Sequence, residues 1–415
     1  MELLGRQRCP QGMMTTRRTL LAFGLAAALT GCRETPAAGP ASPGRKPDPL
    51  PGRLILDSAE GLVLLTDGQR KVLGAGVLAL DSRTAHTARP DGGRTIVERH
   101  DLAASTVIGS HTLEGRWRVK AAAPLGGPVV LTSDGETGSR TTLTLIGPAG
   151  PRRLELDGRI EPEAFATDNS SLFVLDWLPP AAPDRYRVRS LDLASGQVNP
   201  LLTRAKLPVP PRAEEEMRGQ GRQAVVSPDG QVLYTLYTHQ PEHQHTRDLV
   251  AGRPGGVHAF VHTLNLAQGW AYCVDLPAPF GEGPPAGHAL ALSPNGGTLY
   301  VADAAHGRIA VVDTTNLTVP TVLTGLPVSD RPAWLAAAGE GGAWLAAGRT
   351  LQRIRNYQAA ERRELERELT GLQLDGPGQL LYLSDAEGVE WLAPDTGTRR
   401  GRLQVPGGRG LVHAV

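Results

Sequence analysis

Histidine side chains gather in one short stretch of this 415-residue chain. His239, His243 and His245 lie close together, whereas the whole chain holds only 11 histidines. Imidazole nitrogens are preferred ligands of zinc and copper ions, so these three residues are candidate metal ligands. A polar loop whose histidines form ordinary hydrogen bonds is the alternative, because no Cys or Met falls in the same loop. His258 and His262 follow in an expected strand, at a spacing that places them on one face.

The start of the chain carries a second kind of chemistry, that of lipid attachment. Arg17 and Arg18 precede an apolar run at residues 20–29, and Cys32 follows Leu-Thr-Gly. A basic region, a short apolar run and small residues before a cleavage point form a secretory signal. A Cys directly after Leu-Thr-Gly marks the lipoprotein form of that signal, so we expect Cys32 to be lipidated and to begin the mature protein. The arginine pair resembles the twin-arginine export motif, and general secretion is the alternative.

A proline-rich segment at residues 33–52 separates this signal from the rest of the chain. Its composition buries too little apolar surface to fold. We therefore expect a signal peptide at 1–31, a lipidated Cys with a disordered linker at 32–52, and a folded domain at 53–415. The apolar run itself is too short for a membrane span, which needs about 20 residues. This organisation predicts an extracytoplasmic protein held by lipid in a bacterial cell membrane, and the membrane is its first expected partner.

Charge and composition exclude some classes of function. Lys and Arg number 43 against 42 Asp and Glu, with no basic stripe, so nucleic-acid binding is not expected. Aromatic residues make up 4% of the chain, which disfavours a carbohydrate-binding face built from stacked rings. Cys9 lies in the removed region and Cys32 is the lipid site, so Cys273 is left without a partner for an intramolecular disulfide. Its alternating apolar surroundings predict a small buried side chain in a strand.

Short strands recur along the folded domain with a period of about 40 residues. The clearest unit spans residues 289–323, where apolar runs alternate with turns such as Pro294-Asn295-Gly296. Pro sets the backbone angle at the start of such a turn, and Gly accepts the positive φ angle that its end requires. Residues 224–237 repeat half of the plan around Pro228-Asp229-Gly230. Four short strands per unit predict an all-β protein, a β-propeller of four-stranded blades.

The clearest unit resembles the YVTN/YncE-like family of WD40-like propeller repeats. The resemblance is carried by Ser293-Pro294-Asn295-Gly296, Leu299-Tyr300-Val301-Ala302 and Ile309-Ala310-Val311-Val312-Asp313. One blade matches closely, and the others match only in pattern. The resemblance implies the propeller fold and a mostly non-enzymatic role, because propellers support many unrelated functions.

The repeat predicts seven or eight blades. Units are expected at 76–115, 116–156, 160–202, 222–276, 286–324, 331–370 and 371–405. Strands left over at both ends of the chain would build one closing blade, which gives eight, or seven if two weak units merge. The charged run at 358–369 is expected to be a solvent-exposed surface loop, with a helical insert as the alternative.

Four connections are longer than the repeat requires, at residues 178–184, 203–221, 238–257 and 277–287. Because blade strands run up and down, all four are expected on one face of the propeller. Loops held by a rigid scaffold often carry function, so this rim is the predicted ligand-binding face. Its candidate residues are Arg218, Arg222, His239, His243, His245, Phe280, Glu282 and His288.

These features favour a membrane-tethered binding scaffold. In this interpretation, the rim of an extracytoplasmic propeller lipoprotein binds an envelope protein or a small ligand. An exported propeller enzyme or redox subunit is the alternative, with lactonase-like hydrolysis or a metal bound by His239, His243 and His245. A structural envelope factor without a ligand is the third. No nucleophile elbow, phosphate loop or metalloprotease helix occurs in the sequence, so no catalytic residue is assigned and no cofactor is expected beyond that weak zinc or copper site.

Overall fold

The computed structural model describes residues 49–66, 69–124, 126–133, 139–218, 221–339, 341–405 and 407–414. These residues belong to one compact unit that begins at Arg45. The expected export signal at Arg17 and Arg18 and the expected lipid site at Cys32 lie outside the described residues. Among the residues listed above, no helix has the length and apolar character that crossing a membrane requires.

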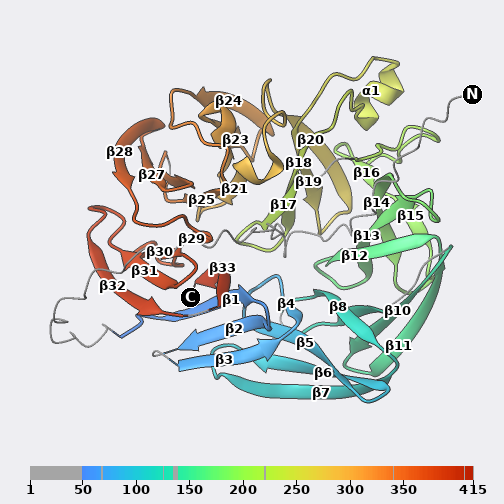
Figure 1. The fold of residues 1–415 in the computed structure, drawn as a ribbon. Helices are drawn as coiled ribbons and strands as arrows, with labels where there is room; N and C mark the ends of the chain where they lie inside the picture. The colour runs from blue at the N-terminus through green and yellow to red at the C-terminus, as the bar shows by residue number, and fades with distance from the viewer. Residues whose placement is uncertain are drawn as a thin grey trace, which may run out of the picture. The chain divides into compact units, whose positions relative to one another are not determined.

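The described residues form eight sheets of mainly antiparallel strands, which stand in a ring as a β-propeller (Figure 1). The fold class predicted from the sequence is confirmed, and the described part of the chain has eight blades. Seven blades have four strands, and the fifth has one more strand, β16, which pairs in parallel with β20. Contacts between the first strands of successive blades, such as β21 with β25 and β25 with β29, show that these strands surround the axis of the ring.

The first four blades occupy residues 53–200, together with the last strand of the chain. Blade 1 contains β1 (Arg53–Ser58), β2 (Gly61–Thr66), β3 (Gln69–Gly74) and β33 (Gly408–Ala414); blade 2 contains β4 (Gly76–Leu78), β5 (Thr84–Asp91), β6 (Arg94–Asp101) and β7 (Thr106–Glu114); blade 3 contains β8 (Trp117–Ala122), β9 (Val129–Ser133), β10 (Arg140–Gly147) and β11 (Gly150–Asp157); blade 4 contains β12 (Arg159–Phe165), β13 (Ser171–Leu178), β14 (Arg185–Asp192) and β15 (Val198–Pro200).

The other four blades follow in chain order. Blade 5 contains β16 (Leu202–Thr203), β17 (Gly221–Val226), β18 (Val232–Thr238), β19 (Phe260–Asn265) and β20 (Trp270–Asp275); blade 6 contains β21 (His288–Leu292), β22 (Thr298–Asp303), β23 (Arg308–Asp313) and β24 (Thr318–Leu323); blade 7 contains β25 (Ala333–Ala337), β26 (Ala343–Ala347), β27 (Thr350–Arg355) and β28 (Gln358–Glu364); blade 8 contains β29 (Gly371–Leu374), β30 (Leu381–Ser384), β31 (Gly388–Leu392) and β32 (Arg399–Gln404). The short helices are α1 (Thr246–Ala251), η1 (Pro285–Gly287) and η2 (Ala304–His306).

Strands from both ends of the chain close the ring, as the sequence predicted. The C-terminal β33 pairs antiparallel with β1, and the order in blade 1 is β3-β2-β1-β33. The chain is already anchored just before β1. Leu50 is 3% exposed, and the hydroxyl of Tyr382 in blade 8 donates a hydrogen bond to the carbonyl of Pro51 at 2.6 Å.

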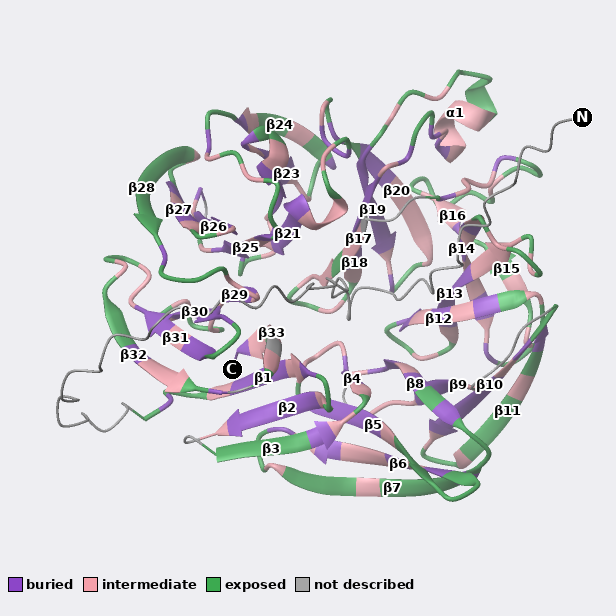
Figure 2. Cartoon of the chain, in the orientation of Figure 1, coloured by how far each residue is buried: buried purple, intermediate pink, exposed green. Residues whose placement is uncertain are grey.

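The repeated turns have the geometry that their residues dictate. Gly296 has φ 75° and Gly230 has φ 72°, in the left-handed region that residues with a Cβ rarely adopt. Ser293 Oγ donates to Asn295 Oδ1 and accepts from the backbone of Thr298, which closes the turn between β21 and β22. Apolar side chains on either side of such turns fill the space between blades, so burial is high on strands in the middle of a sheet, such as β2 (Gly61–Thr66) and β19 (Phe260–Asn265) (Figure 2).

One expectation for the outer surface was wrong. Residues 358–364 form the outer strand β28, not a loop or a helical insert. All seven residues of β28 are exposed, although they pair with β27 along its length. Pairing with the edge of blade 7 therefore overrides the helix propensity of this charged sequence. The charges suit an outermost strand, because they discourage pairing with another chain.

Candidate metal centre

A segment of the 203–221 connection runs beside blade 4 and presents a carboxylate to blade 5. The backbones of Met217 and Tyr186 exchange two hydrogen bonds, with N–O distances of 2.9 and 3.0 Å. Glu214 accepts two hydrogen bonds from Arg189, with nitrogen–oxygen distances of 2.6 and 2.8 Å. These contacts hold the segment against β14 in an extended form.

Alternation along this extended segment explains where Glu215 points. Glu216, like Glu214, pairs with blade 4, at 2.8 Å from Arg187 and 2.7 Å from Arg185. Successive side chains of an extended chain point to opposite sides. Glu215 therefore faces away from these arginines, toward the 238–257 loop and β20 of blade 5.

The 238–257 loop supplies two histidines to the same place. His243 is held by an isolated backbone bridge to Val257. His245 is the N-cap residue of α1, and its backbone N–H donates to the Asp248 carboxylate at 3.3 Å. The helix ends at Gly252, whose φ of 64° places it in the left-handed region. Two of the three histidines that the sequence proposed as ligands, His243 and His245, are thus fixed by ordinary loop and capping contacts.

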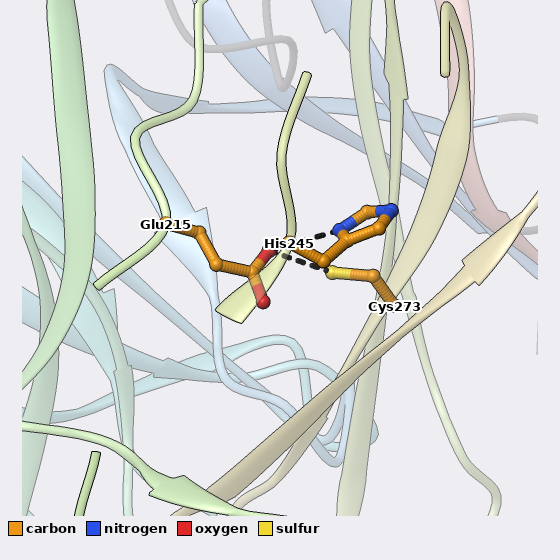
Figure 3. A group of neighbouring side chains, drawn as sticks. All are labelled: Glu215, His245 and Cys273. Carbon is orange, nitrogen blue, oxygen red and sulfur yellow. Dashed lines mark hydrogen bonds and ion pairs between the residues drawn. The ribbon is translucent and has the colours of Figure 1, made fainter. Parts of the chain in front are cut away.

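One oxygen of Glu215 is the centre of the cluster (Figure 3). Glu215 Oε2 lies 3.1 Å from His245 Nδ1, 3.2 Å from Cys273 Sγ and 3.4 Å from His243 Nε2. The donor atoms of Glu215, His245 and Cys273 all lie within 4.8 Å of one another. His245 and Cys273 are each 1% exposed, so the cluster is buried at the seam between blades 4 and 5.

Two further charged residues orient His245. Its Nε2 lies 2.6 Å from Asp275 Oδ1, on the side of the ring opposite Glu215. Arg247 donates to the other oxygen of Asp275 at 2.6 Å and to the carbonyl of Cys273 at 2.7 Å. A carboxylate behind an imidazole fixes the ring and its tautomer, the arrangement found behind most metal-binding histidines.

Phe260 of β19 forms the apolar wall of the cluster. Its ring stacks on His243 with centroids 4.4 Å apart and meets the edge of His245 at 4.8 Å. Tyr237 of β18 also stacks on Phe260, with centroids 5.2 Å apart. The two imidazoles are therefore held between aromatic rings and polar partners, which limits their freedom to turn.

The protonation of the cluster follows from these contacts. Burial alone would raise the pKa of Glu215, but hydrogen bonds from His243 and His245 hold it well below its ordinary value. Burial raises the pKa of the Cys273 thiol strongly, and the negative charge of Glu215 adds to that shift. Burial lowers the pKa of His245, but its hydrogen bonds to Asp275 and Glu215 outweigh this effect and raise the net value. Glu215 is thus an ionised carboxylate whose Oε2 lies within hydrogen-bond distance of His243, His245 and Cys273.

His262 lies beside the cluster on the neighbouring strand. It is 3% exposed and stands directly opposite Cys273 in the pairing of β19 with β20. Burial lowers its pKa to about 4, against a raising effect of Glu215. The expectation that His258 shares its strand face was wrong, because β19 begins at Phe260 and His258 is an exposed loop residue before it.

The donor set suits a borderline-soft metal ion. Imidazole nitrogen, thiolate sulfur and carboxylate oxygen are the groups that bind Zn²⁺ in proteins. Mg²⁺ and Ca²⁺ prefer oxygen ligands alone, so a thiol at the centre disfavours them. A bound ion would stabilise the thiolate, because a metal deprotonates a coordinating thiol outright. The residues present therefore fit a zinc-class ion.

Two other residues of the predicted rim, His239 and Arg218, have different roles. His239 has φ 59° and its Nδ1 lies 2.9 Å from Thr238 Oγ1, so it is not brought to Glu215 with the other two histidines. The backbone N–H of Arg218 donates to Gln240 at 2.8 Å, which ties the 203–221 connection to the 238–257 loop.

The remaining predicted rim residues are spread over neighbouring contacts. Arg222 forms an ion pair with Glu163, which joins the inner strands of blades 5 and 4. His288 is fully buried and its Nε2 accepts a hydrogen bond from the backbone of Gly281 at 3.1 Å. Phe280 is also fully buried, in the core between blades 5 and 6, so it offers no surface to a ligand. Glu282 is exposed on the same connection.

Sequence reasoning missed Glu215, Cys273 and Asp275 as members of the site. Cys273 was assigned to core packing alone, yet it also meets a carboxylate. Glu215 lies 58 residues from Cys273 and 30 residues from His245. The available signal was the position of each residue, because Cys273 and Asp275 end a blade strand on the face where the long connections emerge.

No protein-family model and no curated protein sequence matches the chain. Solved structures with a similar fold include AztD from Citrobacter koseri, with TM-score 0.54, 11% identity, and coverage of 88% of this chain and 96% of that one. The dihydro-heme d1 dehydrogenase NirN, solved in complex with DHE, has TM-score 0.51 and 15% identity, with 90% of this chain and 77% of that one covered. At these identities the similarity shows the propeller fold alone.

Proposed function

We propose that this protein is a metal-binding β-propeller of the bacterial cell envelope, tethered to a membrane by lipid on Cys32. Its centre binds a zinc-class divalent ion through Glu215, His245 and Cys273, with His243 beside them. One observation carries the proposal. A single carboxylate oxygen, on a side chain that is 15% exposed, lies within 3.4 Å of two imidazole nitrogens from the 238–257 loop and of a thiol from β20.

The cluster is better explained by metal binding than by packing. A buried thiol is normally satisfied as a small apolar group, whereas Cys273 Sγ points at an ionised carboxylate 3.2 Å away. Burying a carboxylate is costly unless it is paired and hydrogen-bonded. Metal sites need residues that bind the ion and further residues that hydrogen-bond to those ligands and orient them. Here three donors converge on one oxygen of Glu215, and Asp275 and Arg247 lie behind His245.

The tether and a binding partner belong to the same proposal. Cys32 after Leu-Thr-Gly supports lipid attachment, and Arg17-Arg18 supports export by the twin-arginine route. The loops that carry the ligands also expose large apolar side chains, with Leu207 62% and Val250 59% exposed. Loops held by a rigid scaffold often carry function, so we propose that a partner binds on this rim. The buried metal centre would then stabilise the loops that form the binding surface.

Metal analysis of matched variants tests the proposal. The full chain is stripped of metal, mixed with excess Zn²⁺ and separated from free ions, and bound zinc is measured per chain. We expect one ion for the wild type and for Glu216→Gln, which changes the adjacent carboxylate that faces Arg185 and Arg187. We expect none for Glu215→Gln. A wild type without bound zinc, or equal binding by both variants, would refute the proposed centre.

The tether has its own test. Cys32→Ala should abolish labelling by a radioactive or clickable fatty acid and release the protein from the membrane fraction or leave it unprocessed. A variant that stays in the membrane with a mature N-terminus would show that the lipoprotein assignment is wrong.

A further inference from the structure

We propose that the outer edge of blade 2 pairs with the same edge of a second copy of this chain. The inference goes beyond the proposed function and does not depend on the metal centre. β7 (Thr106–Glu114) is the outermost strand of the blade, in the order β4-β5-β6-β7. An outermost strand presents unpaired backbone N–H and C=O groups, with which another strand can pair. Pairing of β7 with its own copy would join the two blades into one continuous sheet.

The other outermost strands of the described chain have features that discourage such pairing. Sheet edges are protected by short strands, by proline and by charged side chains. β15 has three residues and ends at Pro200, β16 has two residues, and β24 contains Pro320. β3, β11, β28 and β32 each carry at least two charged side chains, for example Arg70 and Lys71 on β3. Among the outermost strands of the eight described blades, only β7 is left without such protection.

The composition and exposure of β7 suit contact with another strand. Residues 106–113 contain no Asp, Glu, Lys, Arg or Pro, and Glu114 supplies the only carboxylate of the strand. Seven of its nine residues are exposed, among them Val107 at 46% and Ile108 at 49%. A long, exposed edge without charge is a ready template for the addition of a strand from another chain.

The backbone of β7 is regular enough to accept a partner strand. Its pairing with β6 is continuous from Gly109 to Glu114, and the one irregularity of this pairing falls at Ile108. A bulge bends a strand locally, so the part of the edge that can pair without distortion begins after Ile108. Ser110 and Thr112 lie in the middle of this part, and both are exposed.

A second copy of the chain is the partner that this edge fits. A symmetric pair of chains places the same patch of both copies around a twofold axis, so residues near the axis face their own counterparts. Like charges directly opposite one another destabilise a strand pair, whereas Thr and Ser side chains can hydrogen-bond across it. Ser110 and Thr112 meet this requirement at the centre of β7. In β28, by contrast, the central Glu361 would face its own copy.

Analytical ultracentrifugation of the full chain over a wide range of protein concentration tests the pairing. One strand from each copy is a small contact beside the roughly 1,600 Å² that a standard complex buries, so the wild type should shift reversibly from one chain toward two as its concentration rises. Ser110→Lys/Thr112→Lys should stay a monomer, because every antiparallel register centred on residues 110–112 places at least one lysine opposite a lysine of the other copy. Ala359→Lys/Ala360→Lys adds the same charge to the exposed β28 and should associate as the wild type does.

A mixture of two variants tests the antiparallel arrangement. Ser110→Glu/Thr112→Glu alone should also be a monomer, but an equal mixture with the lysine variant should form two-chain species, because opposite charges then face each other. This recovery would also show that both variants are folded. A wild type that stays a monomer at every concentration overturns the proposal and leaves the edge to a strand of a different protein. A lysine variant that associates as the wild type does, or a mixture without recovery, overturns the pairing of β7 with itself.

Discussion

The carboxylate behind His245 offers the sharpest test of how the centre is built. Asp275→Asn keeps the size of the side chain and an oxygen that can accept from His245 Nε2, now 2.6 Å from Asp275 Oδ1. It removes the negative charge and leaves Arg247, which donates to the other oxygen at 2.6 Å, as an uncompensated cation near the ion. Changing a residue behind a metal ligand typically weakens metal binding about 10–100-fold, or about 1.4–2.7 kcal/mol. We expect Asp275→Asn to fall in this range.

The assay is a competition titration of Zn²⁺ between the protein and a chromophoric chelator at fixed pH and salt. Asp184→Asn is the matched control, because Asp184 is a rim carboxylate that pairs with Arg185 at 2.9 Å. The control should bind zinc as the wild type does. Equal affinity in the wild type and Asp275→Asn would refute the orienting role of Asp275. Complete loss of binding would mean that Asp275 is itself a ligand, and the geometry would have to be assigned again.

Three further outcomes are expected. Zinc affinity should rise with pH through the neutral range. The reason is that zinc must displace the proton that burial and the charge of Glu215 keep on the Cys273 thiol. Zinc titrations at several pH values measure this, and an affinity that does not change with pH would exclude Cys273 as a ligand. Arg189→Ala should lower the free energy of unfolding in urea by about 2–3 kcal/mol and should also weaken zinc binding. The reason is that Arg189 binds Glu214, the neighbour of Glu215, and so holds this segment in place. Unchanged zinc affinity would show that contacts other than Arg189–Glu214 position Glu215. Burial lowers the pKa of His86 from 6.5 to about 4, so the unfolded chain binds more protons in that window and stability should fall by up to about 3 kcal/mol as pH drops through it. His86→Gln should flatten this part of the urea midpoint profile, and an unaltered profile would contradict the assignment.

The fold could be predicted because its signals are local. Each blade can be recognised in the sequence from short apolar runs and from turns such as Pro294-Asn295-Gly296, whose Gly adopts the required positive φ angle. The closing blade could be inferred from strands left over at the two ends. The outer strand β28 could not, since its charged sequence carries helix propensity and only pairing with β27 makes it a strand.

The site could be predicted only in part, because it depends on contacts between blades. His243 and His245 were visible as neighbours in one loop, but nothing local distinguishes them from His239, which turns away with φ 59°. Glu215 is one of three consecutive glutamates, and which of them faces the histidines is decided by the arginines of β14. Cys273 has the sequence environment of a core residue, and only the docking of blade 4 against blade 5 brings a carboxylate to its sulfur.

Because the number of blades is even, the attachment at the N-terminus and the metal ligands can lie on opposite sides of the ring. In a ring of eight, blade 5 stands half a turn from blade 1. The chain enters the ring at Arg53 in blade 1, while Cys273 lies in the last strand of blade 5. A restraint applied through the N-terminal segment therefore acts on one side of the disc, and the ligands lie on the opposite side. If the protein is tethered as proposed, another protein has access to the loops that carry the metal ligands without having to displace the attachment.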